Sequence, residues 1–281
     1  MTMTRLFLIP ILLLGLIIAG CDSNDTKQGE TMVTLRLQPM VNGSQMLADE
    51  SKTYDINGAT TTFTSARLYL SQIVLHAEDG SDVSLEADPI TVPAKDADDN
   101  TIQHTVTDKI VLVKSDTGLE EYHLGTVPSG RYTGMSFKLG IQGLDNRVDA
   151  SQVPAGHPLA KQTDKNNHWN WSAGYQYIRV DGMVDTDGDG AGDEVWETHL
   201  GTENFLTQID LSLDYTLNDD EASLLHVMAD YGALLTNVDL NDPEQRLCHT
   251  ADNLPVAQKV GANISSAFMF HGVHLDEDAG H

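Results

Sequence analysis

The amino-acid sequence predicts an all-β protein, an antiparallel β-sandwich with long loops in a single domain. Apolar and polar residues alternate with a period of two in several segments, which is typical of half-buried strands. Short turn signals separate these segments. Strand-like segments do not alternate with helical ones, so we do not expect a parallel sheet. Hydrophobic residues make up 40% of the 281-residue chain, which is enough to bury a core.

The expected strands carry apolar residues at alternate positions or in short runs; in chain order they are 33–37, 67–76, 109–114, 135–139, 175–180 and 209–217. Clusters of Asp, Pro, Ser and Gly predict turns at 78–80, 128–130 and 181–182. The one helical candidate is a short turn around residues 231–236.

Residues 1–20 are typical of a secretory signal peptide. Arg5 supplies a positive charge, and the apolar run 6–18 is too short for a comfortable membrane span. The run ends in Ile-Ala-Gly before Cys21, which resembles a bacterial lipobox, so we expect Cys21 to be lipidated. This predicts a periplasmic or surface lipoprotein of a bacterial cell envelope. An ordinary signal peptide followed by a chance cysteine is the alternative.

The mature chain is expected to have three parts. Residues 21–31 are polar and form a lipid-anchored flexible tether, residues 32–270 form the β domain, and residues 271–281 form a disordered acidic tail. If Cys21 carries lipid, Cys248 is the remaining thiol, and we expect it to be buried and unreactive.

The net charge of −26 argues against nucleic acid as a partner, because the phosphate backbone is also anionic. The same charge favours cations. The sequence contains no G-x-S-x-G, H-E-x-x-H, C-x-x-C or P-loop motif. We therefore expect a binding protein and not an enzyme.

Residues 185–194 contain five carboxylates and form a candidate calcium site. The segment begins with the pattern D-x-D-x-D-G, in which alternate carboxylates point at one hard cation and the glycine permits a tight turn. The expected calcium ligands are Asp185, Asp187, Asp189 and Asp193. The loop departs from an EF-hand because its twelfth position is Trp196 and strands are expected on both sides. A solvated hairpin tip is the alternative.

A second candidate site lies where histidines and aromatic residues gather, between residues 156 and 177. Trp169 and Trp171 would share one face of a strand, although both rings can instead serve only in packing. His168 directly precedes Trp169. His199 is expected to begin the next strand and His76 to end an earlier one. The histidines near the end of the chain are expected to be incidental; these are His271, His274 and His281.

Five motifs stand in this order along the chain: Leu68-Tyr69-Leu70-Ser71 with Asp79-Gly80; Pro128, Gly130 and Tyr132 with Phe137, Leu139, Gly140 and Asn146; His157-Pro158; Trp169-Asn170-Trp171-Ser172-Ala173-Gly174-Tyr175; and His199-Leu200-Gly201. Together they resemble the MbnP-like family of periplasmic copper-binding proteins, which is named for a protein of methanobactin operons and includes methanotroph surface copper proteins. The resemblance covers nearly the whole mature chain, and its last two motifs are the most specific.

The resemblance implies Cu(I) bound by histidines and by a tryptophan that has been oxidised to kynurenine. It also implies the partner that oxidises it, a di-haem protein of the MbnH type, similar to cytochrome c peroxidases. Trp169 or Trp171 fits the tryptophan, and the candidate imidazoles are His168, His199 and His76. Imidazole is a good copper ligand. Kynurenine has an aryl amine, whereas the tryptophan ring offers no free lone pair.

The resemblance also implies a C-terminal cysteine pair, which is reduced here to Cys248 alone. The lipobox and the family resemblance together predict a lipid-anchored periplasmic metal-binding protein that binds copper, and the acidic loop is a separate candidate calcium site. The alternative is a calcium-stabilised surface or adhesion lipoprotein without a copper site, in which the aromatic residues are purely structural.

Overall fold

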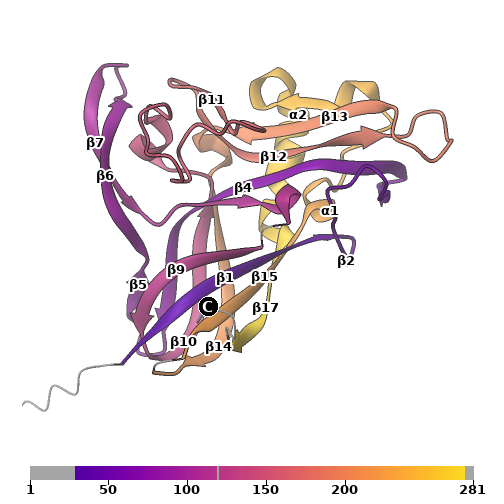
Figure 1. Ribbon diagram of the computed structural model, residues 1–281. Coiled ribbons are helices and arrows are strands. Elements are labelled where there is room, and N and C mark those ends of the chain that lie inside the picture. Colours follow the sequence, from indigo (N-terminus) through magenta and orange to yellow (C-terminus); the bar gives the residue numbers. More distant parts are fainter. Residues whose placement is uncertain (1–28, 119, 220, 276–281) are drawn as a thin grey trace, which may run out of the picture.

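The structure, a computed structural model, describes residues 29–118, 120–219 and 221–275. The predicted signal peptide, Cys21, most of the tether and residues 276–281 lie outside the described residues. The chain is a β-sandwich in which two sheets pack against each other, with a separate hairpin beside them (Figure 1). This confirms the predicted all-β, single-domain fold. Among the described residues, no helix is long and apolar enough to cross a membrane.

The large sheet has the strand order β14-β10-β4-β12-β13-β16, with four short strands attached to β4 or β12. Its strands are β3 (Tyr54–Ile56), β4 (Ala59–Ala77), β5 (Asp82–Ser84), β8 (Val111–Lys114), β10 (Gly130–Leu139), β11 (His168–Asn170), β12 (Gly174–Val184), β13 (Glu194–Gly201), β14 (Thr207–Leu217) and β16 (Leu247–His249). The first half of β4 pairs with β12 and the second half with β10, so this 19-residue strand runs through the whole sheet.

The small sheet has the order β17-β15-β1-β2, and β9 also pairs with β1. Its strands are β1 (Glu30–Val41), β2 (Ser44–Gln45), β9 (Glu121–Pro128), β15 (Ser223–Asp230) and β17 (Phe268–Leu275). The separate hairpin consists of β6 (Glu86–Lys95) and β7 (Thr101–Asp108).

Among the described residues most strand pairs are antiparallel, as expected, but two are parallel: β1 with β15, and β13 with β16. Both pairs join strands that are distant in the sequence. Strands joined by a short hairpin have to be antiparallel, whereas strands joined by a long connection can pair in either direction.

The α-helices are α1 (Tyr231–Leu234) and α2 (Leu254–Asn263), and the 3-10 helices are Ser115–Thr117, Gly143–Arg147, Glu203–Phe205, Pro243–Gln245, Thr250–Asn253 and Ile264–Ala267. The predicted helical turn at 231–236 corresponds to α1. The prediction of a single helical element was wrong, because it missed α2. Asn253 caps α2 by accepting a hydrogen bond from the backbone of Val256, and a proline follows in the first turn. Both residues are ordinary signals of a helix start.

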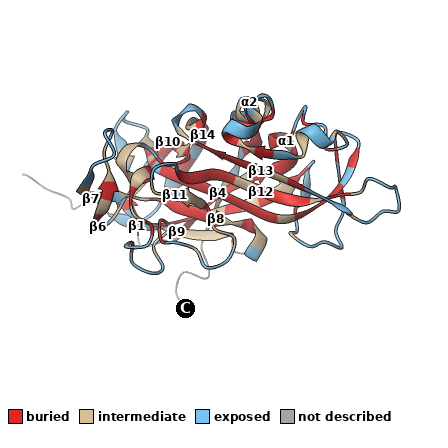
Figure 2. Cartoon of the chain, turned by 90° about the horizontal axis from the view of Figure 1, so that it is seen from above, coloured by how far each residue is buried: buried red, intermediate tan, exposed pale blue. Residues whose placement is uncertain are grey.

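The main core lies between the two sheets and includes Leu35 and Leu37 of β1, Leu68 of β4 and Trp196 of β13. Figure 2 shows the buried stripe along the central strands of the large sheet. A second apolar cluster lies on the other face of that sheet, under the β6–β7 hairpin, and includes Tyr175.

Three local predictions need correction. Asp181-Gly182 is not a turn, since β12 continues through both residues. Gly182 instead permits close packing, because an ideal Cβ there would lie 1.8 Å from the backbone oxygen of Thr62. β17 extends to Leu275, so the predicted tail began inside a strand. At the other end, β1 begins at Glu30, within the predicted tether.

Candidate metal centre

A row of basic side chains crosses the face of the large sheet that is turned away from the main core. The strand register places these residues opposite one another on β8, β4, β12, β13 and β16; they are Lys114, Arg67, Arg179, His199 and His249. Like charges directly opposite each other destabilise a sheet. Carboxylates therefore have to lie among these side chains, and the structure places several there.

Arg67 is the most buried side chain of this row. Its guanidinium donates to the buried carboxylate of Asp116 at 3.0–3.2 Å and to Oδ2 of Asp164 at 2.6 Å. It also donates to the backbone oxygen of Lys165 at 2.7 Å, and the Lys165 ammonium donates to the backbone oxygen of Thr64. These contacts hold the loop before β11 against the sheet.

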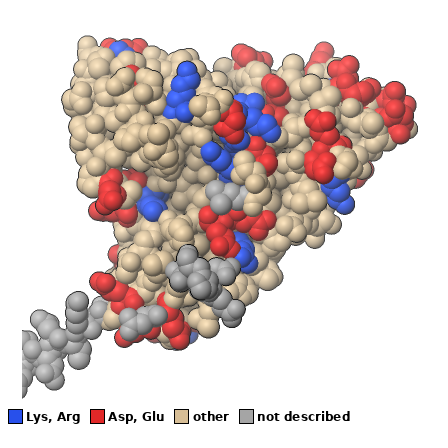
Figure 3. Space-filling model, in the orientation of Figure 1, with Lys and Arg blue, Asp and Glu red and all other residues tan. Residues whose placement is uncertain are grey.

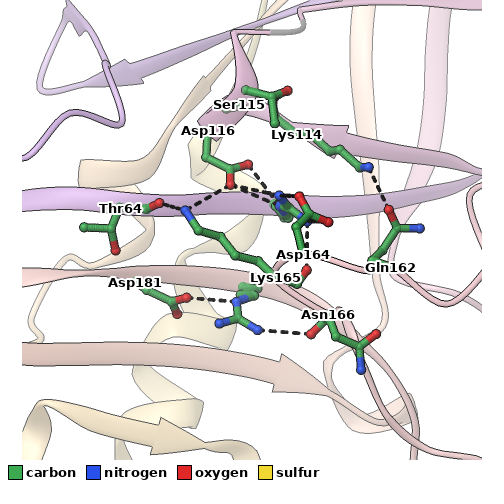
Figure 4. A network of polar contacts seen from close by, with 12 residues as sticks. Thr64, Lys114, Ser115, Asp116, Gln162, Asp164, Lys165, Asn166 and Asp181 are labelled. Carbon is green, nitrogen blue, oxygen red and sulfur yellow. Dashed lines mark hydrogen bonds and ion pairs between the residues drawn. The ribbon is translucent and has the colours of Figure 1, made fainter.

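Arg179 extends the same network toward the histidines. It donates to the backbone oxygen of Asn166 at 3.0 Å and to Oδ2 of Asp181 at 2.8 Å (Figure 4). The other oxygen of Asp181 lies 2.6 Å from Nε2 of His199. Because a carboxylate is the acceptor, Nε2 carries the proton and the lone pair of Nδ1 is left to coordinate. Asp181 thus fixes the His199 ring.

His199 and His249 stack face to face, with ring centroids 4.7 Å apart and an interplanar angle of 20°. Nε2 of His249 lies 2.9 Å from Oε2 of Glu197, and Nδ1 lies 3.8 Å from Oδ2 of Asp252. Glu197, His199 and His249 each offer one ligand atom within 4.8 Å of the others. This group has the donor chemistry of a transition-metal site.

Trp169 lies on the same face. An ideal Cβ on Gly201 would fall 2.4 Å from Cζ3 and 2.7 Å from Cη2 of the Trp169 ring, so a side chain at 201 would displace the indole. Gly201 follows His199 by two residues in β13 and therefore faces the same side of the sheet. The spacing His199-Leu200-Gly201 thus supplies an imidazole and makes room for the tryptophan beside it.

The other predicted copper residues are not members of the group formed by Glu197, His199 and His249. The ring of His168 packs on Tyr175 with centroids 4.7 Å apart, and its Nε2 is buried without a hydrogen-bond partner among the described residues. Burial lowers the pKa of His168. Trp171 follows β11, donates to the backbone oxygen of Arg147 at 2.8 Å and lies under the ammonium of Lys95. The two tryptophan rings have different neighbours, since Trp169 lies against Gly201, and β11 ends at Asn170, before Trp171.

His76 lies near the end of β4, as expected, and its imidazole contacts Asp82 at 2.7 Å and Ser136 at 3.0 Å. His76 lies nine positions after Arg67 on the same strand. At about 3.3 Å per residue, that is roughly 30 Å along the strand. His76 therefore does not join the His199 group. His199 itself stands near the end of β13, not at its beginning.

The candidate calcium loop lies at the tip of the β12–β13 hairpin, where acidic side chains gather (Figure 3). Asp185, Asp187 and Asp189 bring carboxylate oxygens within 4.8 Å of one another. Asp193 is not part of this group. Its carboxylate accepts hydrogen bonds from the backbone N–H and the hydroxyl of Thr186 at 2.8 and 2.7 Å.

A third group of possible ligands consists of His226, His271 and His274. The sequence prediction treated the last two as incidental. It also missed His249, because no local motif marks that residue and only the pairing of β16 with β13 brings it to His199. Cys248 is buried in the main core, as expected, and burial raises its pKa to about 11.

The fold and these groups define an all-β protein with clustered histidines and carboxylates suited to metal ions. The family model of MbnP matches residues 30–250, so the chain belongs to the MbnP family. The matched region contains the His199 group but not His271 or His274.

Among solved structures, the chain is similar to MbnP from Methylosinus trichosporium, with a TM-score of 0.52 and 13% sequence identity. The similarity covers 88% of this chain and 99% of that one. At this level of sequence identity, the similarity supports the fold alone. No curated protein sequence matches the chain.

Proposed function

We propose that this protein is a lipid-anchored, copper-binding protein of the bacterial cell envelope, and a binding protein, not an enzyme. The observation that carries this proposal is the stacked pair of His199 and His249 on the face where Trp169 covers Gly201. The resemblance named above implies two imidazoles and a modified tryptophan, and these residues offer that donor set.

The residues present fit copper. Two imidazoles lie side by side, and Asp181 accepts a hydrogen bond from Nε2 of His199. Carboxylates commonly orient metal-binding histidines in this way. Glu197 adds a carboxylate that would neutralise charge beside the ion. When bound, copper would supply a redox-active centre that is well coordinated by nitrogen ligands. The protein's own part is to hold His199 and His249 with their rings together.

We propose Trp169, and not Trp171, as the tryptophan that a di-haem partner of the MbnH type oxidises. Two molecules of hydrogen peroxide would cleave the indole C2–C3 bond, giving N-formylkynurenine and two molecules of water. Hydrolysis would then release formate and leave kynurenine, whose aryl amine is a further nitrogen donor. Trp171 is a poorer candidate, because its indole N–H is engaged by Arg147 and its ring by Lys95.

The test is intact-mass measurement of the full chain produced with and without the di-haem partner. Conversion of tryptophan to kynurenine gains one oxygen atom and loses one carbon atom. With the partner present, we expect this mass change in the unsubstituted chain and in Trp171→Phe, and we expect no mass change in Trp169→Phe. A change that persists in Trp169→Phe and disappears in Trp171→Phe would overturn the assignment.

Copper content gives the second arm of the test. His199→Gln and His249→Gln should each lose copper after dialysis, whereas His76→Gln should retain it, because His199 is level with Arg67 in the middle of β4 and His76 lies near the end of that strand, beside β10. Copper binding that depends on His76 and not on His249 would contradict the proposed site.

The second candidate function is that of a calcium-stabilised lipoprotein, which the grouping of Asp185, Asp187 and Asp189 favours. A ligand at about 100 times its Kd stabilises the native state by about 2.7 kcal/mol. Millimolar calcium should therefore raise the Tm of chelator-treated protein, and Asp187→Asn with Asp189→Asn should abolish the rise. An unchanged Tm in the unsubstituted protein would reject this site.

The lipid anchor at Cys21 has its own test. Replacing Cys21→Ala should move the protein from the membrane fraction to the soluble periplasmic fraction or block its processing. Unchanged fractionation and electrophoretic mobility would show that Cys21 carries no lipid.

A further inference from the structure

Three histidines meet on the small sheet, away from the site proposed above. His226 lies on β15, and His271 and His274 lie on β17, the edge strand beside it (Figure 1). The His226 ring centroid is 4.7 Å from that of His271 and 5.6 Å from that of His274. Each ring offers a nitrogen within 4.8 Å of the other two.

A β-bulge creates this arrangement. His226 pairs with Gly272 and Val227 pairs with Phe270, so His271 is the extra residue of the bulge. In a regular strand, residues 271 and 274 would face opposite sides, because side chains alternate. The extra residue shifts that alternation and lets both imidazoles reach His226. Opposite His226, Gly272 has no side chain, and an ideal Cβ there would already come 3.8 Å from Nε2 of His274.

The buried member of the group is held in one orientation. Nε2 of His226 lies 2.9 Å from Oε1 of Gln38. Since an amide oxygen only accepts, Nε2 is the donor and the lone pair of Nδ1 is left free, as in metal sites whose histidines are fixed by a second hydrogen bond. The positive charge of Arg36 also lowers the pKa of His226, and Arg36 itself forms an ion pair with Glu121.

The two outer rings are exposed, while His226 is buried. A tetrahedral ion with bonds of about 2.0–2.1 Å holds its ligand atoms roughly 3.3 Å apart, so ligand atoms that now lie within 4.8 Å of one another have to close by at most about 1.5 Å. Exposed side chains can make that adjustment by small rotations. Burial, and then the two neighbouring imidazoles, lower the pKa of His226 to about 4, so its ring is uncharged at neutral pH.

We propose that His226, His271 and His274 form a second metal site, one that binds a borderline divalent transition-metal ion such as Zn²⁺ through nitrogen ligands alone. Its remaining coordination position faces solvent, so the ion is exchangeable. The bound ion ties β17 to β15 at the edge of the small sheet. The site is independent of the one proposed for copper, since it uses other strands and two histidines outside the region that the family model matches.

The test is calorimetric titration of the full chain with Zn²⁺. His271→Gln with His274→Gln should weaken one zinc-binding event by more than about 100-fold, because loss of an outer-shell partner alone typically costs about 10–100-fold. Gln38→Leu should weaken the same event within that smaller range. The matched control is His123→Gln, an exposed histidine outside the three ligand groups, which should leave the titration unchanged.

Two further readouts separate a metal site from a structural role. Co²⁺ should give the intense visible absorption of a tetrahedral site, and the double variant should lose it. Zn²⁺ should slow amide hydrogen exchange in β17 of the unsubstituted chain but not of the double variant.

The His199→Gln, His249→Gln variant keeps this inference apart from the proposed copper function. It should retain the zinc-binding event that the His271 and His274 substitutions remove. If it loses all zinc binding, or if the His271→Gln, His274→Gln variant titrates like the unsubstituted chain, the second site does not exist. The first result would show that zinc binds at His199 and His249 instead, and the second would leave the copper proposal at His199 unaffected.

Discussion

The two carboxylates that hold Arg67 should contribute very differently to stability. Both accept hydrogen bonds from its guanidinium, but the Asp116 side chain is 2% exposed and the Asp164 side chain is 53% exposed, while that of Arg67 is 1% exposed. Removing one partner of a buried pair costs about 3–5 kcal/mol, because the other charge is left desolvated. An exposed partner contributes about 0–1 kcal/mol. We therefore expect Asp116→Asn to cost about 3–5 kcal/mol and Asp164→Asn less than about 1 kcal/mol.

Urea unfolding followed by tryptophan fluorescence measures this difference in unfolding free energy. Asp116→Asn and Asp164→Asn are matched variants, because each removes one carboxylate partner of Arg67. For a domain of this size, about 2–4 °C of Tm corresponds to each kcal/mol, so Asp116→Asn should melt roughly 6–20 °C lower. Arg67→Met combined with Asp116→Leu should cost less than Asp116→Asn alone, because no buried charge is left unpaired. Asp164 and Lys165 lose a partner in that variant, but both side chains are exposed to solvent. Equal costs for the Asp116 and Asp164 variants would refute this account of the row.

Three other predictions concern packing, pH and reactivity. Gly182→Ala should destabilise the protein by about 1–3 kcal/mol or more in urea unfolding, because its new methyl group meets the backbone of β4, whereas Gly272→Ala should cost less because its nearest neighbour would be 3.8 Å away. Burial raises the pKa of Asp108 to about 6, so the protonated form is favoured in the native state and stability should fall as pH rises from about 4 to about 6. Asp108→Asn should remove that part of the pH dependence, and identical pH profiles of unfolding free energy would contradict it. In a Cys21→Ser background, Cys248 should react with a thiol reagent only at the rate of unfolding, and rapid labelling of native protein would show that the thiol is accessible.

The strands were predictable because alternation reports directly on a half-buried sheet. The segment 209–217, for example, alternates throughout and lies within β14 (Thr207–Leu217). The sequence also marked Trp169 and His199 through their local motifs. What it did not show was the register that aligns Arg67, Arg179 and His199 across three strands, because register depends on pairing between distant segments.

His249 and the histidines of β17 were missed for related physical reasons. β16 has three residues, too few for a periodic pattern, and it pairs in parallel with β13. In β17 the bulge at His271 interrupts the alternation, so the segment lost its strand signal and was assigned to the tail. At Gly182 the sequence predicted a turn where the structure has a strand. A glycine that is required for close packing cannot be told from a turn glycine by the sequence alone.

The most direct test of the central claim is to locate copper itself. Anomalous diffraction at the copper edge, from crystals of the full chain loaded with copper after production with its di-haem partner, would place the ion without assumptions about its ligands. We expect a peak beside His199 and His249 on the face covered by Trp169. A peak elsewhere, with none at His199 and His249, would contradict the proposed copper site.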